Sequence, residues 1–234
     1  MNRNLIAAGA LVLALAGCAA TPGAAPSAPP SEQPSLAPSP SATPTPIPVP
    51  TQTALDELIV SPLGIDTILI SEPVPTEPAS TAIVTYDDDK CTYFGKVGEP
   101  FVGLWLPNYA ESAESTDGLG AFTVRTKGGV KNGAVTMLWV WSPKIKTETG
   151  IHRGSSREEV EAAYPNPTHL IHDFVTDIYV IDEGKGRMVI EVVREAGGQL
   201  TEADVDTVYM LGVQPSNVKA VSAANVSGTG GCGE

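Results

Sequence analysis

A proline-rich segment, Ala19 to Thr53, limits how much of this 234-residue chain can form a packed core. It contains eleven prolines, many Ser, Thr and Ala residues, and Glu32 as its one charged residue. Such a composition buries too little apolar surface to offset the entropy lost on folding, and the prolines favour the extended polyproline II conformation. We therefore expect a tether, rising about 3 Å per residue, that can hold a folded body up to about 100 Å from its point of attachment.

The residues before the tether predict export. Arg3 is followed by an apolar run from Leu5 to Leu15, which is shorter than the roughly 20 residues of a membrane-spanning helix and is typical of a signal peptide. The run ends in Leu-Ala-Gly-Cys, which resembles the bacterial lipobox. The resemblance implies cleavage before Cys18 and a diacylglyceryl group on that cysteine. The alternative is an ordinary secretory signal that leaves Cys18 unmodified.

Together these features predict a lipid-anchored protein on the extracytoplasmic face of the cell membrane. The expected layout is a lipoprotein signal peptide at 1–17, a lipid anchor and tether at 18–53, a first β-rich module at 54–146, a second α+β module at 147–222 and a Gly-rich tail at 223–234. The lipid must supply the membrane contact, because 27 acidic against 14 basic residues disfavour adhesion to anionic lipid. The same acidity excludes nucleic acid as the expected partner.

Two cysteines, Cys91 and Cys232, remain after the lipobox cysteine. In an exported protein an even pair of this kind predicts a disulfide, which here would join the Gly-rich tail to the first module. The alternative is a free or intermolecular thiol.

Short β-prone runs separated by turn signals dominate the body. Strands are expected at 65–70, 82–86, 101–106, 121–126, 134–141, 178–181, 188–193 and 207–213, with a strand or short helix at 55–60. The clearest helix is predicted to begin after Gly154, because Ser156 and Glu159 have the spacing of a capping box and Pro165 ends the pattern. The segment 71–80 is expected to be irregular or weakly helical.

The two modules share a pattern. The predicted strand 121–126 matches 188–193, and 134–141 matches 205–211, which favours a duplication. The second module begins Gly-Ile-His-Arg-Gly at 150–154 and continues through Ser156 into Glu-Glu-Val. This start resembles small exported modules of the BamE-like and β-lactamase-inhibitor-protein-like kind. The resemblance covers residues 147 to 213 and implies short helices packed on one face of an antiparallel sheet.

The predicted fold class is therefore α+β, with antiparallel sheets and few short helices. The expected arrangement is two degenerate repeats of a helix-plus-three-strand module. The sequence leaves open whether the strands form two sheets or one continuous sheet.

No pattern in the chain predicts catalysis. His169, His172 and Asp173 lie close enough in sequence to suggest zinc ligands, but on a strand the two histidines point to opposite faces. Asp87 to Asp89 lacks the spaced ligands of a calcium loop, so a solvated turn is expected. Ser156 is better explained as a helix cap than as a nucleophile. We therefore predict no catalytic residue, no metal and no cofactor.

The feature with the most potential for binding is a group of aromatic side chains. At 137–141, strand alternation places Trp139 and Trp141 on one face of a sheet and leaves apolar residues on the other. Two apolar faces are typical of a central strand that is buried on both sides. If one face is instead open, Trp139 and Trp141, with Trp105 and Tyr109, form a candidate binding patch.

The sequence thus predicts a non-enzymatic binding or scaffold protein of the envelope, whose partner is an envelope or secreted protein. A protein inhibitor of a secreted hydrolase is the alternative. A hydrolase would need a catalytic cluster that the sequence does not show.

Overall fold

A computed structural model of the chain describes residues 51–93, 102–110, 120–220 and 232. These residues belong to one compact unit, 48–234. The predicted signal peptide, Cys18, the tether up to residue 50 and the tail apart from Cys232 lie outside them. In the described ranges, no helix combines the length and the apolar character that crossing a membrane requires.

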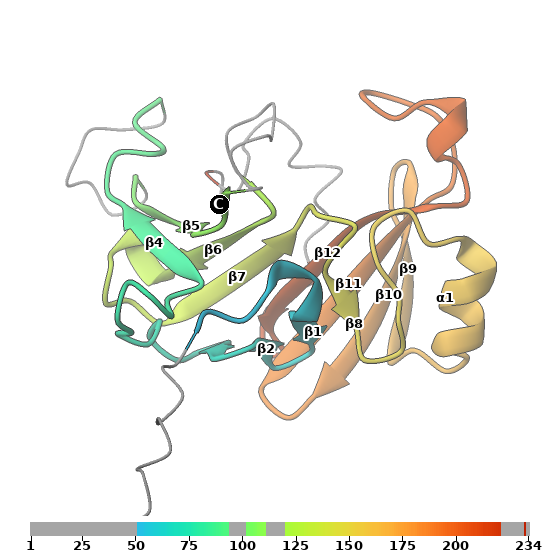
Figure 1. The fold of residues 1–234 in the computed structure, drawn as a ribbon. Helices are drawn as coiled ribbons and strands as arrows, with labels where there is room; N and C mark the ends of the chain where they lie inside the picture. Colours follow the sequence, from blue (N-terminus) through green and yellow to red (C-terminus); the bar gives the residue numbers. More distant parts are fainter. Residues whose placement is uncertain (1–50, 94–101, 111–119, 221–231, 233–234) are drawn as a thin grey trace, which may run out of the picture. The chain divides into compact units, whose positions relative to one another are not determined.

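An eight-stranded antiparallel sheet forms the centre of the body (Figure 1). In spatial order its strands are β4 (Val84–Asp87), β5 (Leu104–Pro107), β6 (Phe122–Thr126), β7 (Val135–Val140), β12 (Val208–Pro215), β11 (Gly186–Val193), β10 (Thr176–Glu183) and β9 (His169–His172). Four of these strands precede residue 147 in the sequence and four follow it. The two groups meet where β7 pairs with β12. Both predicted modules therefore contribute to one continuous sheet.

The register shows which side chains share a face of this sheet. Trp139 lies between Thr123 of β6 and Gly212 of β12, and that ladder continues through Val189 to Val180. All five of these residues are buried. The adjacent ladder begins with Val124 and Leu138 and, because neighbouring residues alternate in a strand, it faces the opposite side.

A second, small sheet packs on the Leu138 face. Its order is β3 (Ile68–Leu69), β2 (Gly64–Ile65), β1 (Ile59–Ser61) and β8 (Lys146–Thr147), and the β1–β8 pair is parallel. A 3-10 turn, η1 (Leu55–Glu57), precedes it, and the further 3-10 turns are η3 (Lys127–Gly129) and η4 (Glu202–Asp204).

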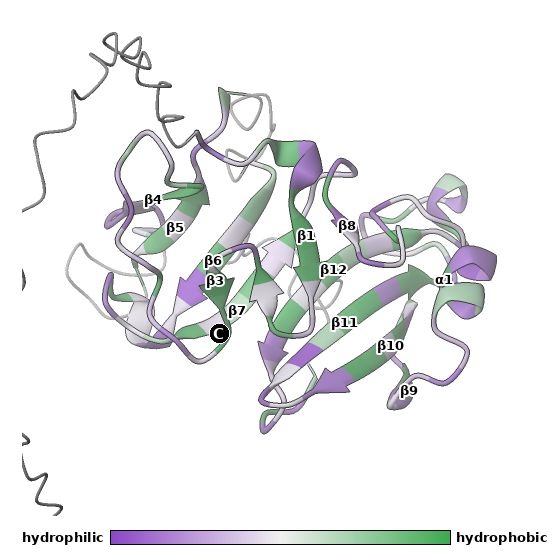
Figure 2. Ribbon diagram, turned by 60° about the horizontal axis from the view of Figure 1, so that its bottom comes forward, coloured by the Kyte–Doolittle hydropathy of each residue, from purple (hydrophilic) through white to green (hydrophobic). Residues whose placement is uncertain are grey.

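The main hydrophobic core lies between the two sheets. It joins Val60, Ile65 and Ile68 of the small sheet to side chains of β6, β7, β11 and β12, including Phe122 and Leu211. Figure 2 shows the hydrophobic colouring along β1 and β10. Burial of apolar surface at about 25 cal/mol per Å² is the main source of stability for such a layer.

The single α-helix of the described residues, α1 (Arg157–Ala163), was predicted at this place. Ser156 Oγ accepts a hydrogen bond from the Glu159 amide at 3.2 Å, and Glu159 Oε2 accepts one from the Ser156 amide at 2.6 Å. The predicted capping box is confirmed. Val160 turns inward into the main core.

The predicted fold class is wrong. The body is mostly β, and the first half has no helix in its described residues to match α1, so there is no helix-plus-three-strand repeat. Residues 71–80 form an irregular segment instead. Pro73, Pro75 and Pro78 explain this, because each proline removes a backbone donor and clashes with a helical turn.

Candidate functional site

The four aromatic residues of the predicted patch do not form a patch. Trp139 is 2% exposed and Trp105 is 8% exposed. They face opposite sides of the sheet, because Trp105 pairs with Val124 whereas Trp139 pairs with the adjacent residue, Thr123. These positions favour the alternative, a strand buried on both faces.

The other two members of this set are half-buried. Trp141 packs against the buried cluster that contains Trp139, and also beside the cysteines and Leu104. Tyr109 Oη donates a hydrogen bond to the Thr53 carbonyl oxygen at 2.8 Å, and burial raises the pKa of Tyr109 to about 12. Trp141 therefore packs with the cluster of Trp139, whereas Tyr109 packs against the main core that contains Trp105, so the four residues do not share one face.

The two remaining cysteines lie at disulfide distance, as the sequence predicts. The Cα atoms of Cys91 and Cys232 are 5.5 Å apart, and both side chains are buried beside Leu104. The bond fixes a residue near the end of the chain to the segment between β4 and β5.

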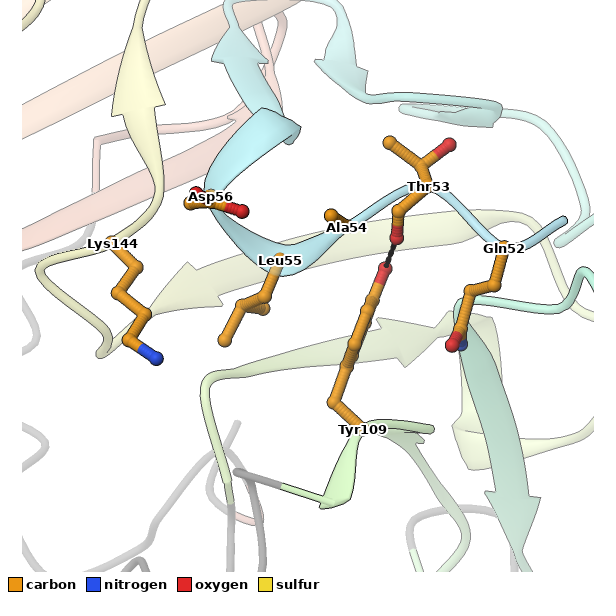
Figure 3. A pocket seen from close by; sticks show the side chains of 7 residues that line it. All are labelled: Gln52, Thr53, Ala54, Leu55, Asp56, Tyr109 and Lys144. Carbon is orange, nitrogen blue, oxygen red and sulfur yellow. Dashed lines mark hydrogen bonds between the residues drawn. The ribbon is translucent and has the colours of Figure 1, made fainter.

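A hollow of about 370 Å³ lies where the tether meets the body (Figure 3). Its lining residues are Gln52, Thr53, Ala54, Leu55, Asp56, Tyr109 and Lys144. Gln52 Nε2 donates to the carbonyl oxygens of Ala82 and Asn108, each at 2.8 Å. Because the side chains of Gln52 and Tyr109 fasten the incoming chain here, we interpret this hollow as a structural seam.

The predicted histidine segment is strand β9, so His169 and His172 do not converge on one metal. His172 Nδ1 lies 2.7 Å from Asp177 Oδ1. Burial would raise the pKa of Asp177, but hydrogen bonds from His172 and Arg157 lower it below the usual value.

Arg157 extends this contact into a network that sequence reasoning missed. Its guanidinium donates to Asp177 at 2.8 Å and to Asp206 at 2.7 Å. These three residues come from the start of α1, from β10 and from the connection before β12. The network therefore braces the helix against the end of the sheet that carries β9.

Asp87, Asp88 and Asp89 are the one group of three or more potential metal-ligating acidic, histidine or cysteine residues in the ranges that the structure covers. A hydrogen bond and the negative charge from Asp87 raise the pKa of Asp89. The carboxylates are half-buried or exposed and repel one another, in keeping with the predicted solvated turn.

The most exposed apolar group among β9 and its turn is Phe174, whose side chain is 74% exposed. It lies in the turn between β9 and β10, which the Asp173 amide closes by donating to the Thr176 carbonyl oxygen at 2.9 Å. Arg194 Nη2 donates to the carbonyl oxygens of Asp173 and Phe174 at 3.1 and 3.0 Å. These hydrogen bonds fix the backbone of the turn, and the Phe174 ring projects from it into solvent.

Strand β9 itself ends the eight-stranded sheet in the part of the chain that the structure describes. Leu170, 46% exposed, lies on this edge. Natural edge strands are commonly protected by lysine, proline or a bulge. The sequence His-Leu-Ile-His of β9 has no such protection, and we call β9 with Phe174 the β9 edge.

Comparison with known proteins found no matching protein family, no similar curated protein and no similar solved structure.

Proposed function

We propose that this chain is a lipid-anchored, extracytoplasmic binding protein that captures another protein through the β9 edge. The observation that carries the proposal is Phe174, a large aromatic side chain that is 74% exposed on a fixed turn. Aromatic side chains that fill a partner's pocket supply much of the energy of protein interfaces. A turn that is already ordered loses little entropy when it binds.

The β9 edge also supports a proposal about the kind of partner. An edge strand presents backbone donors and acceptors that an extended segment of another protein can satisfy. Leu170 beside this edge adds apolar contact, and the His172–Asp177–Arg157 network holds the strand in place. We therefore assign the partner as a protein with an exposed strand and an apolar pocket for Phe174.

The rest of the proposal concerns the N-terminal region. A tether of the predicted length lets the body search a region of the envelope around its anchor.

Inhibition of a secreted hydrolase remains the second candidate, since a narrow turn carrying Phe174 suits a concave catalytic cleft. The two functions differ in one measurement. An inhibitor lowers the turnover of the captured protein, whereas a scaffold leaves it unchanged.

Phe174→Ala is expected to weaken partner binding about 30-fold or more, the loss of a hot spot of roughly 2 kcal/mol. A photo-crosslinking amino acid at position 174 in intact cells first identifies the partner, with the same group at Val130 as the control. Val130 is 47% exposed and lies in the first half of the body. The affinity of the purified partner is then measured for the wild type, Phe174→Ala and Val130→Ala.

Leu170→Lys tests the strand pairing in the same assay, because a charge on the edge opposes the addition of a strand. Equal affinity for wild type, Phe174→Ala and Leu170→Lys would remove the β9 edge from the proposal. So would a partner that crosslinks equally from positions 174 and 130.

Cys18→Ala tests the anchor. Because the thiol of Cys18 is the proposed acylation site, the variant is expected to leave the membrane fraction or to keep its signal peptide. Cell fractionation followed by gel mobility measures both outcomes. Unchanged membrane association together with unchanged mobility contradicts lipid attachment.

A further inference from the structure

A second hollow, of about 270 Å³, lies beside the start of α1 and the start of β12. Its lining includes Pro143, Arg153, Gly154, Asp204, Thr207 and Tyr209. None of these residues belongs to the β9 edge or to the seam where the tether enters. Two of them, Arg153 and Asp204, carry opposite charges.

The guanidinium of Arg153 is held in position by two contacts. Its Nη1 donates to the Trp141 carbonyl oxygen at 3.1 Å, and its Cζ lies 5.7 Å from the centre of the Tyr209 ring. An arginine over an aromatic ring is attracted to the ring face and loses conformational freedom before any ligand arrives. A guanidinium has five N–H donors, so most of them stay available to an acceptor such as a carboxylate.

The carboxylate of Asp204 is also held in position. Its Oδ2 accepts hydrogen bonds from the Thr201 amide at 2.8 Å and from Thr201 Oγ1 at 2.7 Å. These bonds, and the nearby charge of Arg153, lower the pKa of Asp204, so it is ionised at neutral pH. Both of these hydrogen bonds go to Oδ2 and not to Oδ1.

The two charges lie near each other without forming an ion pair with each other. Each is fastened by its own neighbours, so the hollow keeps a positive and a negative group apart on its wall. A ligand that carries both charges, separated by a short chain, satisfies both groups at once. A ligand with a single charge leaves one of them without a partner.

We propose that this hollow binds a small zwitterion of the amino-acid or short-peptide class. The ligand carboxylate is bound by Arg153, and the ligand ammonium group by Asp204. The volume is below the usual range of drug-sized pockets, which suits a ligand of one or two residues. Thr207 and Gly154 also line the hollow.

The test is an NMR titration of the ¹⁵N-labelled chain from Ala19 onward with the dipeptide alanylalanine. Saturable shifts are expected at the amides of Gly154, Thr207 and Val208. The N-acetylated dipeptide lacks the ammonium charge and the dipeptide amide lacks the carboxylate, and each is expected to bind at least tenfold more weakly.

Two variants assign the contacts. Arg153→Gln is expected to bind the dipeptide and its amide equally, and Asp204→Asn to bind the dipeptide and its N-acetylated form equally. Asparagine can still accept the bonds from Thr201, so the turn should persist, and an unchanged spectrum away from the hollow verifies folding. Lys131→Gln removes an exposed charge elsewhere and should bind as the wild type does.

Three results would each overturn the proposal: no saturable shift with alanylalanine, equal affinity of the wild type for all three dipeptides, or unchanged affinity in folded Arg153→Gln. These outcomes are independent of whether the β9 edge captures a protein.

Discussion

Trp139→Ala is expected to lower the free energy of unfolding by about 3–5 kcal/mol, enough to leave much of the protein unfolded at physiological temperature. The indole is 2% exposed and packs against Ile178, Val180 and Met210. It also covers Gly212, where any Cβ would collide with the ring. Its removal leaves a cavity that the rigid backbone of a central strand cannot close.

Urea unfolding followed by circular dichroism, on the chain from Ala19 onward, measures this loss. Val130→Ala is the matched control, because that side chain is 47% exposed and its truncation should cost less than about 0.5 kcal/mol. A folded Trp139→Ala protein with the unfolding midpoint of the wild type would show that position 139 lies outside the core.

Reducing the Cys91–Cys232 bond is expected to destabilise the body by up to about 5 kcal/mol. The two cysteines are 141 residues apart in sequence, so the bond restricts the unfolded chain strongly. The chain-entropy relation for loops of this size gives the magnitude. Both sulfurs also belong to a small buried cluster with Leu104, which loses its packing when the cysteines separate.

Denaturant midpoints with and without reductant test this second expectation. The double variant Cys91→Ser, Cys232→Ser should unfold at the midpoint of the reduced wild type and should not respond to reductant. Two titratable thiols in the unreduced native protein, or equal midpoints in both conditions, would contradict it.

Local signals predicted the elements well. The alternation at 134–141 predicted β7 (Val135–Val140), and the capping box predicted the start of α1. These signals depend on residues close in sequence, which interact in the same way in many folds. The run 65–70 was less accurate, because it holds two short strands with a turn at Asp66, where φ is 49°.

Local signals did not predict which strands pair when they lie far apart in the sequence. Nothing in the sequence of β7 indicates that it pairs with β12 of the second half in addition to β6 of its own half. The resemblance in the second half led to a repeat with helices, but the prolines at 73, 75 and 78 exclude a helix where the repeat needs one. The parallel pairing of β1 with β8 joins residues 87 positions apart, and no local pattern indicates it.

Local sequence signals were also insufficient to predict the candidate sites. The apolar pattern around Trp139 fitted both a buried strand and an open face, and only the burial of Trp139 in the fold decides between them. Phe174 is exposed on an ordered turn because Arg194, twenty residues later in the sequence, donates a hydrogen bond to its carbonyl oxygen. The local sequence does not indicate this contact. Arg153 and Asp204 meet at one hollow from distant segments, so neither carried a signal in the sequence.

The way the chain enters the body sets how it responds to a pulling force. If the protein is held by the proposed lipid anchor, a force along the tether reaches the fold at Gln52 and Thr53. There it meets three hydrogen bonds, two from the Gln52 amide and one from Tyr109, before it reaches strand β1. Because these bonds reach the carbonyls of Ala82 and Asn108 as well as the first residues of the body, the stress spreads into the loops beside β4 and β5. A pull on the chain before residue 52 would therefore load these three hydrogen bonds before it loads the pairing of β1.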